Sequence, residues 1–344
     1  ATHHDHRPAV QLEVEKILRL LYRTKSPLPD MLKFLRETLA GKSEENDKEE
    51  EDVDYGNAPV TVHKLTNDPT VAWKVLRPQQ HYRRLEPMPL DTPVDPDKVR
   101  FVCVSDTHNQ IHRMSHPIPD GDVFLHAGDI TQMGKLQKLM RFNDFLANLP
   151  HKHKIVIAGN HDLVLHQQML SEGESDDFLV SQGLSEKSKL EEAGLNRARD
   201  LFTNCTYLED EETTVYGLKV YGSPWQPEFC DWAFNLPRGQ PCLDKWNLIP
   251  TDIDVLITHG PPIGHGDLCK YGHRAGCVEL LHTIQQRVKP KFHVFGHIHE
   301  DPGVTTDGVT TYINASTCNL MYRPDNPPII FDLPLPPGKT KADY

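Results

Sequence analysis

The stretch that decides the fold is KVRFVCVSDTHN at residues 98–109, followed by DGDVFLHAGDI at 120–130. Each segment is an apolar run that ends in residues able to bind a metal, the first in Asp106 and His108 and the second in Asp129. A continuous apolar run bounded by polar residues is typical of a strand buried on both faces. Because ligands of open α/β sheets lie beyond the carboxyl ends of the strands, we expect these three side chains at one edge of a sheet.

The same pattern recurs three more times along the chain. HKIVIAGNHD ends in Asn160, His161 and Asp162, DVLITHGPP contains His259, and KFHVFGHIHE contains His297 and His299. Taken singly, a histidine on an apolar strand is usually a core residue, and Gly-Asp or Gly-Asn is usually a turn. Five such endings in succession are difficult to explain by turns alone. Clusters of Asp, His and Asn are what a two-metal hydrolytic centre requires, so we predict such a centre.

Composition limits the classes of function. No apolar run of the 344-residue chain approaches the length of a membrane span, and the first residues lack an apolar signal region, so we expect a cytoplasmic protein with no membrane partner. The seven cysteines are scattered, which favours a reducing compartment over a disulfide framework. The net charge of −12 disfavours general nucleic-acid binding.

The chain divides into an N-terminal extension, residues 1–57, and a larger domain, residues 58–344. Helical spacing over 9–41 predicts two short amphipathic helices on either side of a proline-containing break, and the acidic run at 43–54 predicts a solvated linker. A partner-binding role and a loosely docked extension fit residues 1–57 equally well, and any protein partner is unknown.

Within the larger domain, strands alternate with helices. The pattern predicts helices over 135–149 and 278–288, a β-hairpin over 214–225 with Gly217 at its turn, and strands within 310–317 and 326–333. Periodicity alone therefore predicts an α/β domain with a largely parallel sheet. The polar segment 171–200 is expected to form helix and loop over the site, and whether it gates the site is left open.

The five strand endings resemble the sequence blocks of the calcineurin-like metallophosphoesterase superfamily. Over about 58–334 the chain more closely resembles the metallophosphoesterase-domain-containing (MPPED) group, through RFVCVSDTH, HKIVIAGNH, NLPRGQ, HGPP, TTYINAST and NPPIIFDLP. This resemblance implies an α/β fold of two packed mixed β-sheets flanked by helices, with metals at the strand ends.

The resemblance also implies a ligand set for two divalent or transition metal ions. The first ion would take Asp106, His108, Asp129 and His299, and the second Asn160, His259 and His297, with Asp129 bridging. Nitrogen and oxygen ligands without thiolate suit Mn, Fe or Zn, of which Mn is our first expectation. His-x-His places two side chains on the same side of an extended segment, so each imidazole can reach one of two neighbouring ions.

The mechanism we expect is attack on phosphorus by a hydroxide that bridges the two ions. His161 would not bind metal, and would act as the general acid that protonates the leaving oxygen. Asp162 either orients His161 or caps the following helix, and we favour the cap.

One departure from the superfamily bears on the substrate. In its phosphoprotein phosphatases the Gly-Asp block continues with an Asp that supports the catalytic His and an Arg that grips the phosphate. Here residues 130–134 read Ile-Thr-Gln-Met-Gly, so both charges are missing. A site without that Arg suits a singly charged diester better than a dianionic monoester. We therefore expect a phosphodiesterase, and the resemblance points to 2′,3′- or 3′,5′-cyclic nucleotides.

Contacts to a nucleotide substrate need an apolar wall and a few polar groups near the metals. The candidates are Asn160, His161, Trp225, Phe229, Trp232, Phe234, Arg238 and the pair Pro261-Pro262. The alternative for the aromatic residues is that they pack the loop onto the core. Two rival functions stay open: a nucleotide-binding or scaffold protein with little turnover, and a nuclease of the same superfamily.

Overall fold

A computed structural model gives the fold and describes residues 59–167 and 186–344. The predictions for residues 1–57, and those for 171–185, lie outside the described residues. The proposed domain boundary at residue 58 stays a prediction.

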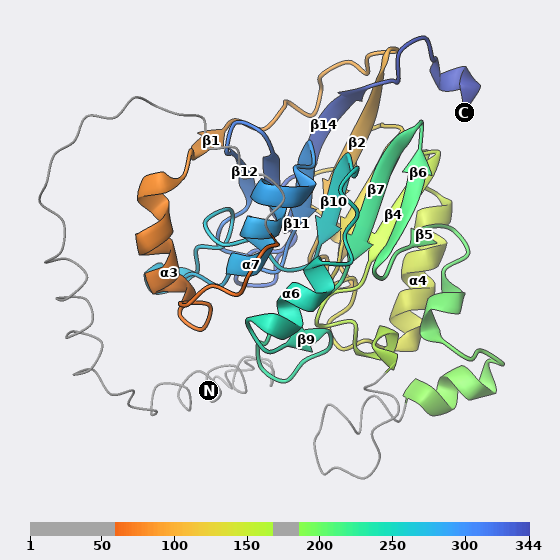
Figure 1. The fold of residues 1–344 in the computed structure, drawn as a ribbon. Coiled ribbons are helices and arrows are strands. Elements are labelled where there is room, and N and C mark those ends of the chain that lie inside the picture. Colours follow the sequence, from red (N-terminus) through yellow and green to blue (C-terminus); the bar gives the residue numbers. More distant parts are fainter. Residues whose placement is uncertain (1–58, 168–185) are drawn as a thin grey trace, which may run out of the picture. The chain divides into compact units, whose positions relative to one another are not determined.

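Two mixed β-sheets pack against each other (Figure 1). The five-stranded sheet has the order β14-β2-β3-β4-β5. Its strands β2 to β5 are parallel, whereas β14 runs antiparallel to β2 along one edge. The bounds are β2 Lys98–Val104, β3 Val123–Ala127, β4 His153–Ile157, β5 Thr206–Tyr207 and β14 Ile329–Pro334.

The seven-stranded sheet has the order β1-β12-β13-β11-β10-β7-β6. Its central strands β13, β11, β10 and β7 are parallel, and β1, β12 and β6 pair antiparallel. The bounds are β1 Arg83–Leu85, β6 Glu211–Val215, β7 Leu218–Ser223, β10 Val255–Thr258, β11 Phe292–Phe295, β12 Gly303–Thr306 and β13 Thr311–Asn314. A short parallel ribbon joins β8 Gln226–Pro227 to β9 Asn235–Leu236.

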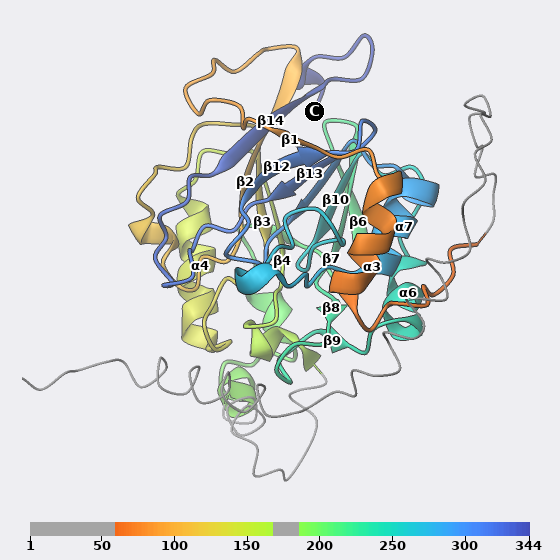
Figure 2. The same ribbon diagram turned by 90° about the vertical axis from the view of Figure 1, so that its left-hand side faces the viewer.

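Helices cover the outer faces of both sheets (Figure 2). Helix α4, Leu136–Ala147, buries Leu139, Phe142 and Leu146 against the five-stranded sheet. The other sheet is covered by α3 Pro69–Leu76, α6 Gln240–Trp246 and α7 Val278–His282, the last continuing as a π-helical segment over Thr283–Val288. Within the described ranges, no helix has the length and hydropathy of a membrane span.

The predicted sandwich of two mixed sheets is confirmed. The predicted helices correspond to α4 and α7, the hairpin to β6 and β7, and the last two strands to β13 and β14. Periodicity alone predicted a largely parallel sheet, but the five ligand-bearing strands divide between two sheets. Strands β2, β3 and β4 belong to one sheet, and β10 and β11 to the other, because a sequence pattern records burial and not strand order.

A buried ion pair fixes the edge of the five-stranded sheet. The guanidinium of Arg100 on β2 binds both carboxylate oxygens of Asp332 on β14, at 2.6 and 2.9 Å, and donates to the carbonyls of Thr92 and Pro93. The Arg100 side chain is 2% exposed, so its charge depends on this partner.

We expect Asp332→Ala to lower the free energy of unfolding by about 3–5 kcal/mol, because the variant leaves the buried Arg100 charge unpaired. Denaturant unfolding measures the change. Asp95→Ala removes the partner of Lys98 in an exposed pair and should have little effect. Equal stabilities for the two variants would contradict this account.

Candidate metal centre

Polar side chains at the carboxyl ends of five parallel strands meet where the two sheets adjoin. They follow β2, β3, β4, β10 and β11, and Asp106, Asp129 and Asn160 among them are at most 2% exposed. The sheets are joined at this point by a backbone bridge between Ser105 and Ser316. Side chains far apart in sequence are thereby brought within hydrogen-bonding distance.

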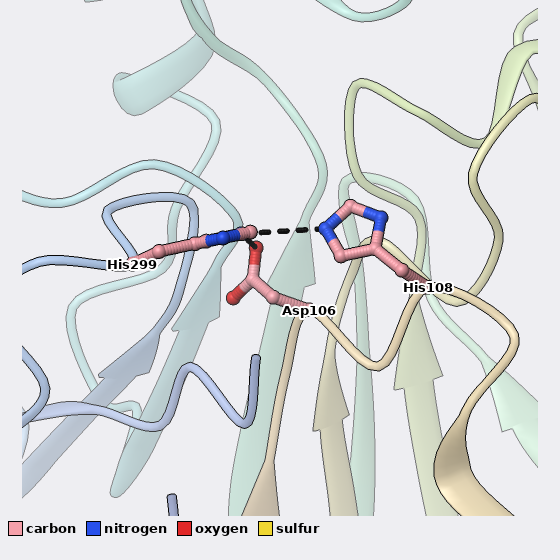
Figure 3. Close-up of side chains that lie close together, drawn as sticks. All are labelled: Asp106, His108 and His299. Atoms are coloured by element: carbon pink, nitrogen blue, oxygen red, sulfur yellow. Dashed lines mark hydrogen bonds and ion pairs between the residues drawn. The ribbon is translucent and has the colours of Figure 1, made fainter. Parts of the chain in front are cut away.

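One oxygen of Asp129 faces a first set of ligand atoms. His108 Nε2 lies 3.7 Å from Asp129 Oδ2 and 3.3 Å from His299 Nε2, which in turn lies 3.4 Å from Asp106 Oδ1. Figure 3 shows the imidazoles of His108 and His299 and the carboxylate of Asp106 pointing toward one another.

The other oxygen of Asp129 faces a second set. His259 Nε2 lies 3.4 Å from Asp129 Oδ1 and 3.0 Å from Asn160 Oδ1. His297 Nδ1 lies 2.9 Å from the same amide oxygen. All seven side chains predicted to bind metal therefore come together. Asp129 lies between the other six, with His108 facing one of its oxygens and His259 facing the other.

Backbone carbonyls orient the imidazoles. The Nδ1–H groups of His108, His259 and His299 donate to the carbonyls of Thr131, Ala127 and Asn319, at 3.2, 2.9 and 3.3 Å respectively. Because a carbonyl can only accept, Nδ1 carries a proton in each ring, and in the neutral form of the ring Nε2 presents a lone pair to the centre. His108 Nε2 and His299 Nε2 lie 3.3 Å apart, an approach that requires either a proton or a metal ion between the two lone pairs. The donor set therefore fits divalent metal ions.

Burial and charge set the protonation of the site. Burial lowers the pKa of His108 and of His297 to about 3, so both rings are neutral at pH 7, the form that binds metal. Burial opposes ionisation of Asp129, but the surrounding histidines, of which His259 contributes most, together outweigh it and hold the Asp129 pKa well below its usual value. Although burial lowers the His259 pKa, Asp129, with a smaller contribution from Asp106, raises it to about 9.

The backbone at the site adopts sparsely populated conformations. Asp106, His108, Asp129 and His297 have φ of 49°, 42°, 54° and 68°. Each such residue costs about 1–3 kcal/mol and is typical of functional sites. The prediction that His-x-His is an extended segment is wrong, because His297 is left-handed. The side chains of His297 and His299 still reach the centre, with Ile298 buried between them.

His161 lies at the edge of the centre. Its Nδ1–H donates to the carbonyl of Gln132 at 2.9 Å, and its Nε2 lies 3.9 Å from Asp129 Oδ2. The ring of Trp232 packs on it, with centroids 4.1 Å apart. The ring is thus held with Nε2 toward the two sets of ligand atoms.

Asp162 does not cap the following 3₁₀ turn, Leu163–Leu165, so that prediction is wrong. Its carboxylate accepts from the backbone N–H groups of Ile130, Thr131 and Gly159, at 3.1, 2.8 and 3.0 Å. Burial raises its pKa to about 7. Asp162 thereby links the loop after β3, which contains Ile130 and Thr131, to the loop after β4, which contains Gly159. The N–H groups of these residues are buried, so they need a buried acceptor such as this carboxylate.

Three of the predicted substrate contacts are engaged elsewhere. Trp225 donates to Asp210 at 2.9 Å, Phe234 is fully buried, and Arg238 donates to the carbonyls of residues 275 and 276. These positions agree with the alternative that the loop packs onto the core. Phe229 and Trp232 of the same loop border the centre instead, Phe229 with its ring centroid 5.8 Å from that of His297.

Tyr322 is a site residue that sequence reasoning missed. Its ring centroid lies 4.8 Å from that of His108 and 5.4 Å from that of His299. It belongs to the connection between β13 and β14, which has no periodic pattern. The signal that could have found it is the length of that connection, since long loops beside strand ends often carry functional residues.

Comparison with known proteins gives consistent matches. The family model described as calcineurin-like phosphoesterase matches residues 99–301. Metallophosphoesterase domain-containing protein 1 of Mus musculus is 47% identical over 289 residues, covering 82% of this chain and 87% of that protein. The Homo sapiens protein of the same name is 48% identical over 284 residues, covering 80% and 86%. A UPF0046 protein of Caenorhabditis elegans is 48% identical over 289 residues, covering 82% and 98%.

Gly296 allows the segment after β11 to approach Ser105 and Asp106 closely. A Cβ at this position would overlap Asp106 Oδ2 and Ser105 Oγ. We expect Gly296→Ala to lower the free energy of unfolding by about 1–3 kcal/mol, because the carboxylate or the loop must move. Denaturant unfolding without added metal measures this, and an unchanged value would contradict the close approach.

Proposed function

The chain belongs to the calcineurin-like phosphoesterase family, and we propose that it is a two-metal phosphodiesterase that hydrolyses cyclic nucleotides. The observation that carries the proposal is the position of Asp129 between six other candidate ligands, with His108 facing one of its oxygens and His259 the other. Asp106, His108, Asp129 and His299 would hold one ion, and Asn160, His259, His297 and Asp129 the other. When bound, the ions would activate water and offset charge on the phosphoryl group. Mn is our first choice, with Fe and Zn as alternatives.

His161 is the proposed general acid. The bond from its Nδ1–H to the carbonyl of Gln132 persists when the ring is doubly protonated. The Nε2 proton then faces the centre and can pass to the leaving oxygen. The ring of Trp232 limits rotation of the imidazole, so the proton is held in one direction.

The charges around the centre favour a diester over a monoester. In the part of the chain that the structure describes, the ion-pair partners of Asp106 and Asp129 are histidines. Thr131 follows the Gly-Asp block where related phosphatases carry charge, and its hydroxyl donates to Asp162. A dianionic monoester would lack the bidentate Arg contact that its second charge requires. A singly charged diester needs no such contact.

Aromatic rings border the centre on several sides. Trp232 packs on His161, Phe229 lies against His297, and Tyr322 packs against His108. Phe229 is 53% exposed, so its ring is available to a ligand. A flat base stacked on such a ring, with its phosphate at the metals, is the arrangement we propose for a cyclic nucleotide.

A substrate panel tests the proposed activity. Mn-loaded protein is assayed on 2′,3′- and 3′,5′-cyclic nucleotides, bis(p-nitrophenyl) phosphate, p-nitrophenyl phosphate and single-stranded DNA. We expect the diesters to be hydrolysed faster than the monoester, and the cyclic nucleotides faster than DNA. Binding of cyclic nucleotides without hydrolysis would favour the low-turnover binding protein, and faster cleavage of DNA would favour the nuclease.

We expect His161→Ala to keep two metal equivalents while kcat falls by roughly 10²–10⁴, the usual contribution of a general acid. Metal analysis and steady-state kinetics on the same preparation measure both quantities. Asp106→Asn is the contrasting variant and should lose metal. Loss of metal from His161→Ala would refute its assignment as a residue that does not bind metal.

We expect Phe229→Ala to raise KM for a cyclic nucleotide about tenfold with little change in kcat, because stacking of one base contributes about 1–3 kcal/mol. KM for the base-free substrate bis(p-nitrophenyl) phosphate serves as an internal comparison. Leu248→Ala is the matched control, since Leu248 is a similarly exposed apolar residue on the segment after α6. Unchanged KM for Phe229→Ala would remove this ring from the substrate site.

A further inference from the structure

Two buried polar side chains connect ligand residues of the two sheets. Asn314 ends β13 and Ser316 follows it, and they are 0% and 1% exposed. The residue between them, Ala315, packs into the core. Nothing in the proposed chemistry uses Asn314 or Ser316 directly, yet Ser316 bonds to the ligand Asp106, and Asn314 bonds to Ile298, the residue between His297 and His299.

Asn314 holds the loop that carries two of the imidazoles. Its Nδ2 donates to the carbonyl of Ile298 at 2.8 Å and to that of Gly266 at 2.9 Å. Ile298 is the residue between His297 and His299. The amide oxygen of Asn314 accepts the N–H of Ser316 at 3.0 Å. The Asn314 side chain thus links the loop that carries His297 and His299 to Ser316, the second residue after β13.

Ser316 continues this connection to the other sheet. Its hydroxyl donates to Asp106 Oδ2 at 2.8 Å. The backbone reinforces the link, because the N–H of Thr317 donates to the carbonyl of Ser105 at 2.8 Å. Asp106 follows β2 of the five-stranded sheet, whereas Ser316 follows β13 of the seven-stranded sheet.

The bond from Ser316 distinguishes the two oxygens of Asp106. Oδ2 accepts from the Ser316 hydroxyl, whereas Oδ1 lies 3.4 Å from His299 Nε2. The N–H of His297 lies 3.0 Å from both oxygens and so does not discriminate between them. Without the hydroxyl, the hydrogen bond that distinguishes the two oxygens is lost, and the His297 N–H restrains both oxygens equally.

We propose that Asn314 and Ser316 are positioning residues that hold the ligand residues of the two sheets in place relative to one another at the metal centre. Ser316 fixes Asp106 as a ligand through one oxygen, and Asn314 fixes the loop bearing His297 and His299. This inference rests on the two-metal function proposed above. It assigns to the segment Asn314-Ala315-Ser316 a task separate from catalysis, namely affinity for the ions.

The test is a calorimetric titration of metal-free protein with Mn²⁺ alone. Loss of a group that orients a metal ligand commonly costs about 10–100-fold in affinity. For Ser316→Ala we expect such a loss at one of the two metal sites, that of Asp106, with the other affinity unchanged. For Asn314→Ala we expect losses at both sites, because His297 and His299 belong to different sets.

Thr317→Val is the matched control. Thr317 is also 1% exposed, and its hydroxyl has no hydrogen-bond partner among the described residues. Removing that hydroxyl at constant volume should leave both affinities unchanged. Ser316→Cys is a second variant of nearly the same volume with a weaker donor, and it should repeat the selective loss if Ser316→Ala does not fold.

The outcomes separate this inference from the proposed function. Wild-type protein that binds fewer than two equivalents of Mn²⁺ overturns the two-metal function and the positioning roles together. If wild-type protein binds two equivalents of Mn²⁺ and the Ser316 variants bind Mn²⁺ with unchanged affinities, the positioning role alone is overturned. Equal losses in Ser316→Ala and Thr317→Val would also overturn it, because general disturbance of the segment would then explain the effect.

Discussion

The carboxylate of Asp129 is buried between two groups of imidazole nitrogens, each facing a different oxygen. Burying an ionised carboxylate costs several kcal/mol unless partners compensate. Here two buried carboxylates, Asp106 and Asp129, share one small region, and their ion-pair partners within the described residues are histidines. Two cations would satisfy this concentration of lone pairs and negative charge. The arrangement is therefore suited to metal binding and poorly suited to stability without metal.

The sandwich architecture makes this concentration of ligands attainable. The carboxyl ends of parallel strands lie at the same edge of a sheet. Because two sheets are in contact here, the strand ends of both sheets lie next to each other. Backbone bonds across the junction, between Ser105 and residues 316–317, hold the rows together. Left-handed conformations at Asp106, His108, Asp129 and His297 then turn the side chains inward. Strain at these positions is offset by the packing of the strands that precede them.

The sequence predicted the parts of this structure that depend on local pattern. Apolar runs ending in Asp, Asn and His located the ligand strands, because a buried strand is an apolar run in the sequence and the turn that follows it contains polar residues. The packing of two sheets came from the family resemblance, since periodicity does not encode strand order. The sequence analysis missed Tyr322 and assigned Asp162 to the wrong role for the same reason. Their positions depend on which loops meet in space, and no local pattern distinguishes Asp162 from a helix cap. For Phe234 and Trp225 the sequence left two interpretations open, because an aromatic loop near a site can equally well pack inward.

The central claim is that two metal ions share Asp129. Electron paramagnetic resonance of the Mn²⁺-loaded protein tests it most directly, because ions bridged by one carboxylate lie about 3.5–4 Å apart and couple magnetically. The account predicts an exchange-coupled spectrum at two equivalents of Mn²⁺, and its loss in Asp129→Asn. A spectrum of isolated Mn²⁺ ions at full loading, unchanged by that substitution, would contradict it.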